Sequence, residues 1–491
     1  MVRKLIEWAV ANPFIAILAA IALAVGGGYA FINVNVEAYP DPAPAIIEVV
    51  AQFPGASAEE VERQVTIPLE VALAGMPGLD STRSKSLFGL AHLRNQFDYS
   101  RKYDEAKQDV INRIAMAQLP AGVVPQISPA SPTGEILRYT LKNPKDAAGR
   151  PYYTLYDLKA LQDYTLQRDF LRVQRIAGVT CTGGAVKRYE IQPDPERLHR
   201  FGISLQQLIT AVGAANGNGS GDNLIQGHTN LVVRAIGLYG NGQDPMMQVL
   251  GMKSPAEAAG YLRAEEARRI REIRQTVVTS VNNVPVRVDQ LVDGGPKLNE
   301  DGTTDLPDAE LVRRGVVVGT QTRQGKVSQS TPVKDADGKE VLDPDGRRKW
   351  DDEDEKVQAI VLLRKGQESL PALRDVAAKI EELNQPGHLL PGVTIEPYYN
   401  RTDLINVTTE TVHENLLLGL CLVTAILLMF LSNVRVAVIV AINIPLALLF
   451  AFSVLYFRGR SANLLSIGAV DFGIIVDSSV IIVENIYRRV S

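Results

Sequence analysis

The sequence LLLGLCLVTAILLMFLSNVRVAVIVAINIPLALLFAFSVLYF, residues 416–457, contains one charged side chain, that of Arg435. Short polar residues divide it into two apolar runs, 416–434 and 436–457. A helix of about 20 residues crosses a hydrocarbon core of roughly 30 Å, so each run is long enough to span a membrane. Backbone groups in lipid must satisfy their own hydrogen bonds, which predicts a helical hairpin with a kink at Pro445.

Two further apolar runs lie near the ends of the chain, at 8–36 and 462–487. The first follows Arg3 and Lys4, and a cleaved signal peptide is the alternative interpretation. An export signal usually has a shorter apolar region, so we favour a membrane anchor. The sequence thus predicts four transmembrane helices, at 8–36, 416–434, 436–457 and 462–487, which form a membrane α-helical bundle.

The last apolar run contains three acids, Asp471, Asp477 and Glu484. A charged group near the bilayer centre costs at least about 2.5 kcal/mol, so each acid should face a bundle interior, a water path or a cation. At helical spacing Asp477 and Glu484 share one face, and Asp471 lies about a third of a turn away. Surroundings that alternate would shift a carboxyl pKa up and down, so these acids could take up and release protons. The alternative, a soluble core helix with polar caps, fits poorly with the hairpin before it.

Basic residues at the ends of the apolar runs indicate the orientation. With the N-terminus in the cytoplasm, that side receives the larger basic group: Arg3, Lys4, Arg435, Arg488 and Arg489. The short segment between the third and fourth apolar runs lies on the opposite side and contains Arg458 and Arg460. Residues from about 37 to 414 then lie on the far side, which in a bacterial inner membrane is the periplasm.

The polar middle of the chain contains two sets of alternating strand and helix patterns. In the first, Ser57 and Glu60 form a capping-box pattern that starts a helix after the strand 45–53. Strands at 82–87 and 91–97, a helix at 103–118 and a strand at 123–127 complete the order β-α-β-β-α-β, the ferredoxin-like unit. The same order returns in segments at 136–141, 155–175, 177–179, 358–363, 370–383 and 393–398. A large insertion divides this second unit, so we expect an α+β periplasmic domain.

Composition excludes several other classes of protein. The chain of 491 residues has 51 basic and 55 acidic side chains, and this balance offers no field for binding nucleic acid. Its two cysteines, Cys181 and Cys421, exclude a disulfide framework. Two Asp-Gly segments, at 335–338 and 343–346, lack the ligand spacing of an EF-hand and are predicted to be turns. The sequence indicates no cofactor and no enzyme.

With these features the chain resembles the resistance-nodulation-division (RND) transporters, and most closely their heavy-metal efflux branch of the cobalt-zinc-cadmium type. The resemblance covers nearly the whole chain. It rests on the segments 10–14, 38–41 (AYPD), 53–55 (FPG), 65–70 (VTIPLE), 119–123 (LPAGV), 201–205 (FGISL), 399–402 (YNRT), 471–473 (DFG), Asp477 and 483–485 (VEN). Ser478 follows Asp477, where the multidrug branch usually has a second aspartate, and Asn400 stands where an aspartate is common.

The resemblance implies a proton-driven inner-membrane permease that works as a homotrimer with a periplasmic adaptor (membrane fusion) protein and an outer-membrane channel. Asp471, Asp477 and Glu484 match the proton-relay acids of the metal branch. By position, 37–131 would be the first porter subdomain, 132–180 with 284–398 the second, and 181–283 an inserted docking subdomain. Family members are about twice as long, so we expect this chain to be an N-terminal half that needs the second half of the transporter, including its relay lysine. The polar stretch 326–356 is longer than expected.

The cargo is expected to be a divalent metal cation such as zinc, cobalt, nickel or cadmium. Leu465 and Ile475 stand where copper-type members carry methionine, the ligand that Cu(I) and Ag(I) prefer. Glu135 and Asp163 are candidate metal contacts, and a solvated turn acid and a surface helix acid are the alternatives. Two other functions stay open: an RND pump for organic compounds or lipids, and a truncated membrane-anchored protein that transports nothing.

Overall fold

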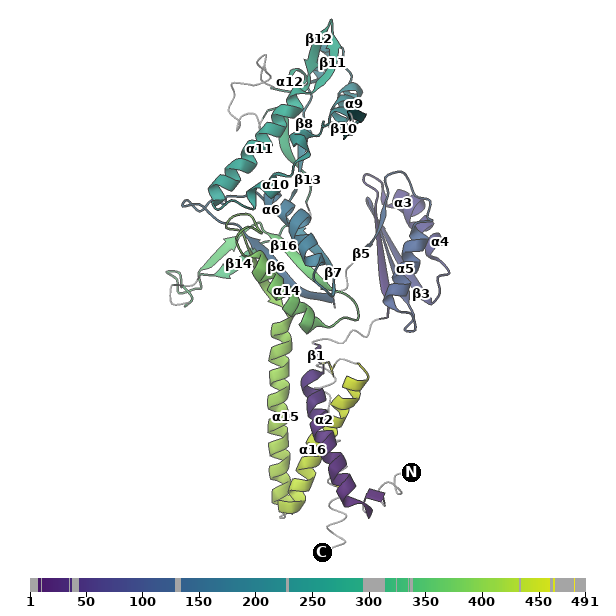
Figure 1. Ribbon diagram of the computed structural model, residues 1–491, viewed down its shortest axis with the longest axis vertical. Coiled ribbons are helices and arrows are strands. Elements are labelled where there is room, and N and C mark those ends of the chain that lie inside the picture. The colour runs from purple at the N-terminus through teal and green to yellow at the C-terminus, as the bar shows by residue number, and fades with distance from the viewer. Residues whose placement is uncertain are drawn as a thin grey trace.

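A computed structural model describes residues 8–9, 11–34, 36–37, 44–128, 134–226, 229–294, 314–323, 325–333, 335, 339–431, 434–459, 462–463 and 481. The described elements form an elongated molecule, with three long helices at one end and sheets with their covering helices at the other (Figure 1).

The helical end contains α2 (Pro13–Asn33), α15 (Arg401–Leu431) and α16 (Val434–Phe457). Helix α2 packs against α16, where Val34, Leu448 and Phe452 form a small core. Gly27 permits this approach, because a Cβ at its position would lie 2.6 Å from the Cβ of Leu449. Two short strands, β1 (Val36–Glu37) and β18 (Ala462–Asn463), pair in parallel beside these helices.

Among the described residues, α2 is the one helix that is long and apolar enough to cross a membrane. Helices α15 and α16 cover the second and third apolar runs, as expected, and a membrane crossing by them stays a prediction. Of the fourth run, 462–487, only 462–463 and 481 are described, so the expected fourth helix lies almost entirely outside the described residues.

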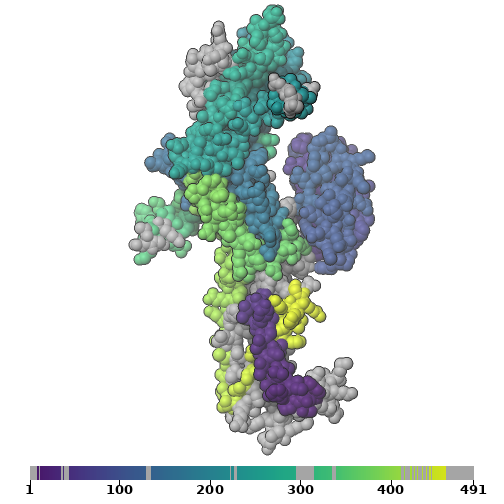
Figure 2. Space-filling view, in the orientation of Figure 1, coloured from purple at the N-terminus to yellow at the C-terminus, as the bar shows by residue number. Residues whose placement is uncertain are grey.

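The first soluble unit is a four-stranded antiparallel sheet covered by helices. Its strands β2 (Ile46–Gln52), β3 (Leu79–Leu87), β4 (Leu90–Phe97) and β5 (Pro125–Ser128) have the spatial order β3-β4-β2-β5. The helices are α3 (Ala58–Val61), the π-helical turn η1 (Glu62–Thr66), α4 (Ile67–Leu73) and α5 (Tyr103–Ile114). The predicted capping box is confirmed, because the Ser57 amide donates to Glu60 Oε2 over 2.8 Å and the Ser57 hydroxyl accepts from the Glu60 amide. In Figure 2 this unit is a lobe beside the rest of the soluble part.

The second soluble unit has the same strand order. Its strands β6 (Glu135–Lys142), β7 (Ile176–Gly183), β16 (Val357–Leu363) and β17 (Thr394–Asn400) are arranged β17-β6-β16-β7, all antiparallel. Its helices are α6 (Leu155–Leu161), the π-helical turn η3 (Gln162–Leu166), α7 (Gln167–Leu171) and α14 (Ser369–Leu383). The final strand β17 runs directly into α15.

The insertion folds around a third core. Its strands are β8 (Val186–Ile191), β9 (Gly219–Gln226), β10 (Thr229–Ala235), β11 (Val277–Val281), β12 (Val284–Arg287) and β13 (Val316–Thr322). Its helices are α8 (Pro195–Phe201), α9 (Leu205–Ala215), the 3-10 turn η4 (Tyr239–Gly242), α10 (Pro245–Val249), α11 (Pro255–Gln275) and α12 (Val288–Leu291). The longest of these helices, α11, is amphipathic and rich in charged side chains.

The insertion does not end at residue 283, where the sequence placed its boundary. The sequence predicts that 284–398 belongs to the second unit. Val286, Leu291 and Val316 instead pack in the third core, with Ile203 and Ile270 of the insertion. The cause is the pairing of β13 with β8, which returns the chain to the insertion's own sheet.

The described residues of the polar stretch 326–356 include a pair of antiparallel strands that lies on the second unit. The strands are β14 (Gln329–Pro332) and β15 (Trp350–Glu353). The predicted turn near 343–346 is present, because Asp343 accepts hydrogen bonds from the amides of Asp345 and Arg347. The Thr140 hydroxyl donates to Gln329 Oε1 over 3.0 Å, and Lys145 pairs with Glu353 at 3.0 Å, so the strand pair is tied to the sheet.

Candidate functional site

The three predicted relay acids, Asp471, Asp477 and Glu484, lie outside the described residues. The structure does place the residues that lead into their run. Ala462 and Asn463 form β18, and they pair with Val36 and Glu37 at the end of α2. The entry to the acidic run is therefore fixed beside the first helix.

Glu135 begins β6, at the edge of the second sheet where β17 passes into α15. Its carboxylate accepts hydrogen bonds from the Arg138 guanidinium, with Nε at 3.1 Å. The same Arg138 lies over the ring of Tyr399 at 5.7 Å, and Arg401 donates to the Glu135 carbonyl over 2.6 Å. Glu135 is thus half-buried and paired with a cation, rather than a solvated turn acid.

Asp163 lies in the π-helical turn η3 and pairs with Lys159. Lys159 Nζ donates to Asp163 Oδ1 over 2.9 Å, and the Lys159 side chain is 7% exposed. Burial disfavours the charged lysine, but Asp163 and Cys181 outweigh that effect and raise the pKa of Lys159. Burial also raises the pKa of the Cys181 thiol to about 11, so the thiol is protonated at neutral pH.

The described residues do not bring these two candidates together in a metal site. Within the part of the chain that the structure describes, no group of three or more His, Cys, Asp or Glu side chains could hold a metal ion. Asp163 lines a pocket, and Glu135 is not among the residues that line it.

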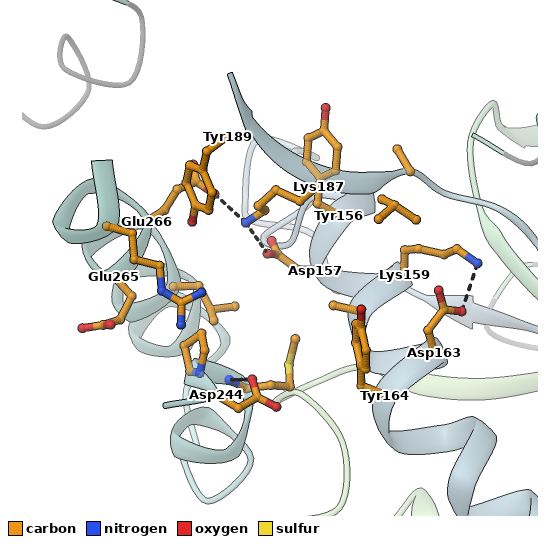
Figure 3. Close-up of a pocket in the computed structure, with 17 residues that line it drawn as sticks. Tyr156, Asp157, Lys159, Asp163, Tyr164, Lys187, Tyr189, Asp244, Glu265 and Glu266 are labelled. Atoms are coloured by element: carbon orange, nitrogen blue, oxygen red, sulfur yellow. Dashed lines mark hydrogen bonds and ion pairs between the residues drawn. The ribbon is translucent and has the colours of Figure 1, made fainter. Parts of the chain in front are cut away.

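That pocket has a volume of about 380 Å³ and lies between the second unit and the insertion (Figure 3). We call it the junction pocket. One wall comes from α6 and η3, the opposite wall from α10 and α11, and β8 runs across it. Its labelled side chains are Tyr156, Asp157, Lys159, Asp163, Tyr164, Lys187, Tyr189, Asp244, Glu265 and Glu266.

Two buried acids and two cations form a ring of ion pairs at the junction pocket. Lys187 Nζ lies 2.5 Å from Glu266 and 3.7 Å from Asp157. Arg263 also pairs with both acids, with its Nη1 at 3.6 Å from Glu266. The Asp157 and Glu266 side chains are 4% and 7% exposed. Their paired cations therefore offset the free-energy cost of burying two negative charges. The ring therefore ties α6 of the second unit to α11 of the insertion.

The sequence did not identify this ring. Thr154 and Asp157 do form a capping box at the start of α6, a local pattern that could have been noticed. The partners of Asp157 are Lys187 and Arg263, the latter more than a hundred residues away along the chain. No spacing rule relates residues at that separation.

The AcrB/AcrD/AcrF family model matches residues 5–254 and 336–491 of this chain. The chain belongs to this family of RND transporters. The resemblance to RND proteins seen in the sequence is thereby confirmed. The unmatched part, 255–335, contains α11 and β13, so the α11 part of the junction pocket's lining lies outside the family match.

Curated relatives of this RND chain include a cation efflux system protein, a metal-resistance protein and a protein named HelA. "Cation efflux system protein CzcA" of Alcaligenes sp. (strain CT14) is 31% identical over 496 residues. "Cobalt-zinc-cadmium resistance protein CzcA" of Cupriavidus metallidurans and "Protein HelA" of Legionella pneumophila are each 30% identical. All three alignments cover 100% of this chain and 40% of the relative. The chain therefore spans about two fifths of the length of these relatives.

The chain is also similar to solved structures of a metal efflux pump. Two crystal forms of a heavy metal efflux pump are 30% identical to this chain, with TM-scores of 0.69 and 0.71. Each comparison covers 99% of this chain and 41% of the pump. The described fold is that of an RND efflux pump.

Proposed function

We propose that this chain is the N-terminal part of a proton-driven permease that exports divalent heavy-metal cations across a bacterial inner membrane. The observation that carries the proposal is the alignment of the whole chain with cation efflux proteins at 30–31% identity. The chain spans 40% of their length, so the complete transporter would include the second half of the protein.

The soluble units would be the moving part of the pump. We infer that the two four-stranded units are ferredoxin-like porter repeats, since they share one strand order. The insertion around the third core would be the docking subdomain. In this arrangement metal cations leave from the periplasmic side, through a periplasmic adaptor protein and an outer-membrane channel.

The driving force would come from Asp471, Asp477 and Glu484. A charged carboxylate within an apolar run raises the free energy of the membrane-inserted state, and protonation removes that charge. We therefore infer that these acids form a proton pathway. Proton uptake and release would alternate with movement of the porter units, and a lysine in the second half would be their cationic partner.

A homotrimer is part of the same proposal, and the hairpin β9–β10 supports it. Its strands carry exposed aliphatic side chains, among which Ile225 and Val232 are 75% and 73% exposed. An aliphatic hairpin exposed on both faces is typical of a surface that another chain covers. A second copy of this chain is the partner that a symmetric oligomer supplies.

Zinc, cobalt, nickel and cadmium are the proposed cargo, since carboxylate and imidazole ligands suit such ions. Glu135 and Asp163 stay proposed contacts for the cation in transit. Each would have to leave its cation partner, Arg138 or Lys159, before it could bind a metal ion.

The experiment that tests this proposal is transport by the complete protein in liposomes with an imposed proton gradient. Zinc, cobalt and cadmium would each be compared with a lipophilic dye as cargo. We expect gradient-dependent transport of at least one of the metals and none of the dye. Transport of the dye alone would show a pump for organic compounds, and transport of neither would show a chain without pump activity.

A further inference from the structure

Glu37 joins the membrane part of the chain to the second soluble unit. It lies in β1, just beyond the C-terminus of α2, and its carboxylate reaches the N-terminus of α14. The Ser369 amide donates to Glu37 Oε1 over 2.7 Å, and the Ser369 hydroxyl donates to Glu37 Oε2. Ser369 is 0% exposed and Glu37 is half-buried, so the contact is partly shielded from water.

The same two-residue strand also holds the start of the acidic run. Val36 pairs with Ala462 and Glu37 with Asn463, in parallel register. Asn463 precedes Asp471 by eight residues in the sequence. The backbone of Glu37 is thus fixed to the entry of the predicted relay, while its side chain is fixed to α14.

Helix α14 connects the Glu37–Ser369 contact to the core of the second unit. Ala372, Leu373, Val376 and Ile380 are buried in the core of that unit, beneath the sheet that contains β6 and β16. A displacement of the first turn of α14 therefore has to move or strain that core, because packed cores resist deformation. The same core also contacts the insertion, because Ala258 and Leu262 of α11 are buried in it.

The interaction has the form of a strong helix cap. A carboxylate that accepts an amide hydrogen and a hydroxyl hydrogen at a helix N-terminus gains from charge-assisted hydrogen bonding and from the helix dipole. In an ordinary capping box the acid belongs to the helix it caps, as Glu60 does at α3. Here the cap comes from more than three hundred residues away, so it fixes two parts of the fold to each other.

We propose that Glu37 is a positioning residue for transport: it transmits movement at the start of the acidic run to α14, and so couples proton passage to the second porter unit. This rests on the proposed function. Its physical basis is one continuous series of contacts, from Asn463 to Glu37, from Glu37 to Ser369, and from α14 to the core.

The test compares E37A, E37Q and E37D in the complete transporter, reconstituted with zinc and a proton gradient. Glu60→Gln is the matched control, because that carboxylate also accepts a capping hydrogen bond, but within the first unit. We expect E37A to lower the zinc exported per proton about tenfold, the scale of one charged hydrogen bond. E37Q keeps one acceptor and E37D keeps the charge, so both should recover part of the coupling. E60Q should match the wild type.

A second measurement separates coupling from transport itself. Hydrogen exchange of the first turn of α14, from Ser369, is followed at neutral and at mildly acidic pH. In the wild type we expect the protection of these amides from exchange to change with pH. In E37A we expect the protection to be independent of pH, with the trimer content unchanged. Wild-type coupling in E37A, or an unaltered pH response of α14, would overturn the proposal. If the wild type exports no cation, the proposed function fails, and the exchange response of α14 still decides the role of Glu37.

Discussion

Arg274 and Asp289 form an ion pair inside the third core. Their side chains are 0% and 2% exposed, and Arg274 Nη1 lies 3.2 Å from Asp289 Oδ1. Burial raises the pKa of Asp289 from 3.8 to about 6, a larger effect than the lowering by Arg274. Arg274 also donates to the Arg314 carbonyl, so the pair holds the end of α11 against the segment that leads into β13.

This pair predicts a pH dependence of local stability. The folded pKa of Asp289 lies above its unfolded value, so the folded state binds the proton more tightly. Its contribution to the free energy of unfolding is full below pH 3.8 and falls as the pH rises to about 6. Hydrogen exchange of α11 and β12 measures this fall, and D289N should remove it. An unchanged slope in D289N would contradict the assignment, and D104N, in the first unit, should retain the wild-type slope.

Local spacing explains which residue contacts were predictable. Asp163 is four residues from Lys159 on a helical segment, so this pair follows the ordinary i, i+4 rule. Glu135 and Arg138 lie three residues apart on strand β6, where successive side chains alternate between faces, so no spacing rule predicts their pairing. Helical spacing thus predicts a cation partner for Asp163 and none for Glu135. The contact of Glu37 with Ser369 and the ring around Asp157 join distant parts of the chain, and no sequence pattern indicates them.

At the scale of elements, the strands and helices of both soluble units were predictable because their apolar residues follow periods of two and 3.6. The boundary of the insertion was not. Helix α11 contributes Leu262 to the core of the second unit and Ile273 to the third core, so one helix belongs to two cores. Periodicity identifies a buried face but not the core that buries it.

The joint between β7 and β8 depends on Gly183. Its φ is +75°, and a Cβ there would lie 2.2 Å from the Lys356 carbonyl oxygen. G183A should therefore destabilise the joint by about 1–3 kcal/mol, the usual cost of a strained backbone position. Hydrogen exchange of β7 and β16 measures the change. G213A is the matched control, since a Cβ on that helical glycine meets nothing within 4 Å. Wild-type protection in G183A would show that the joint relaxes freely.

At the scale of the whole molecule, the exposed hairpin predicts a dependence of the oligomer on aliphatic side chains. I225D or V232D should weaken trimer association at least about tenfold, because burial of one such side chain contributes roughly 1.5–3 kcal/mol. Light scattering of the purified complete transporter measures the trimer fraction. N230D, which adds a charge at an exposed polar position of β10, should have little effect. A full trimer fraction in both aliphatic variants would exclude the hairpin from the interface.

The most direct measurement is zinc export by the complete transporter in liposomes, with and without a proton gradient, for the wild type and D477N. We expect the wild type to export zinc only when the proton gradient is present. We expect D477N to export no zinc under either condition. D351N, which changes an acid of the exposed β15, should export as the wild type does. Gradient-dependent export that persists undiminished in D477N would contradict proton coupling through the acidic run.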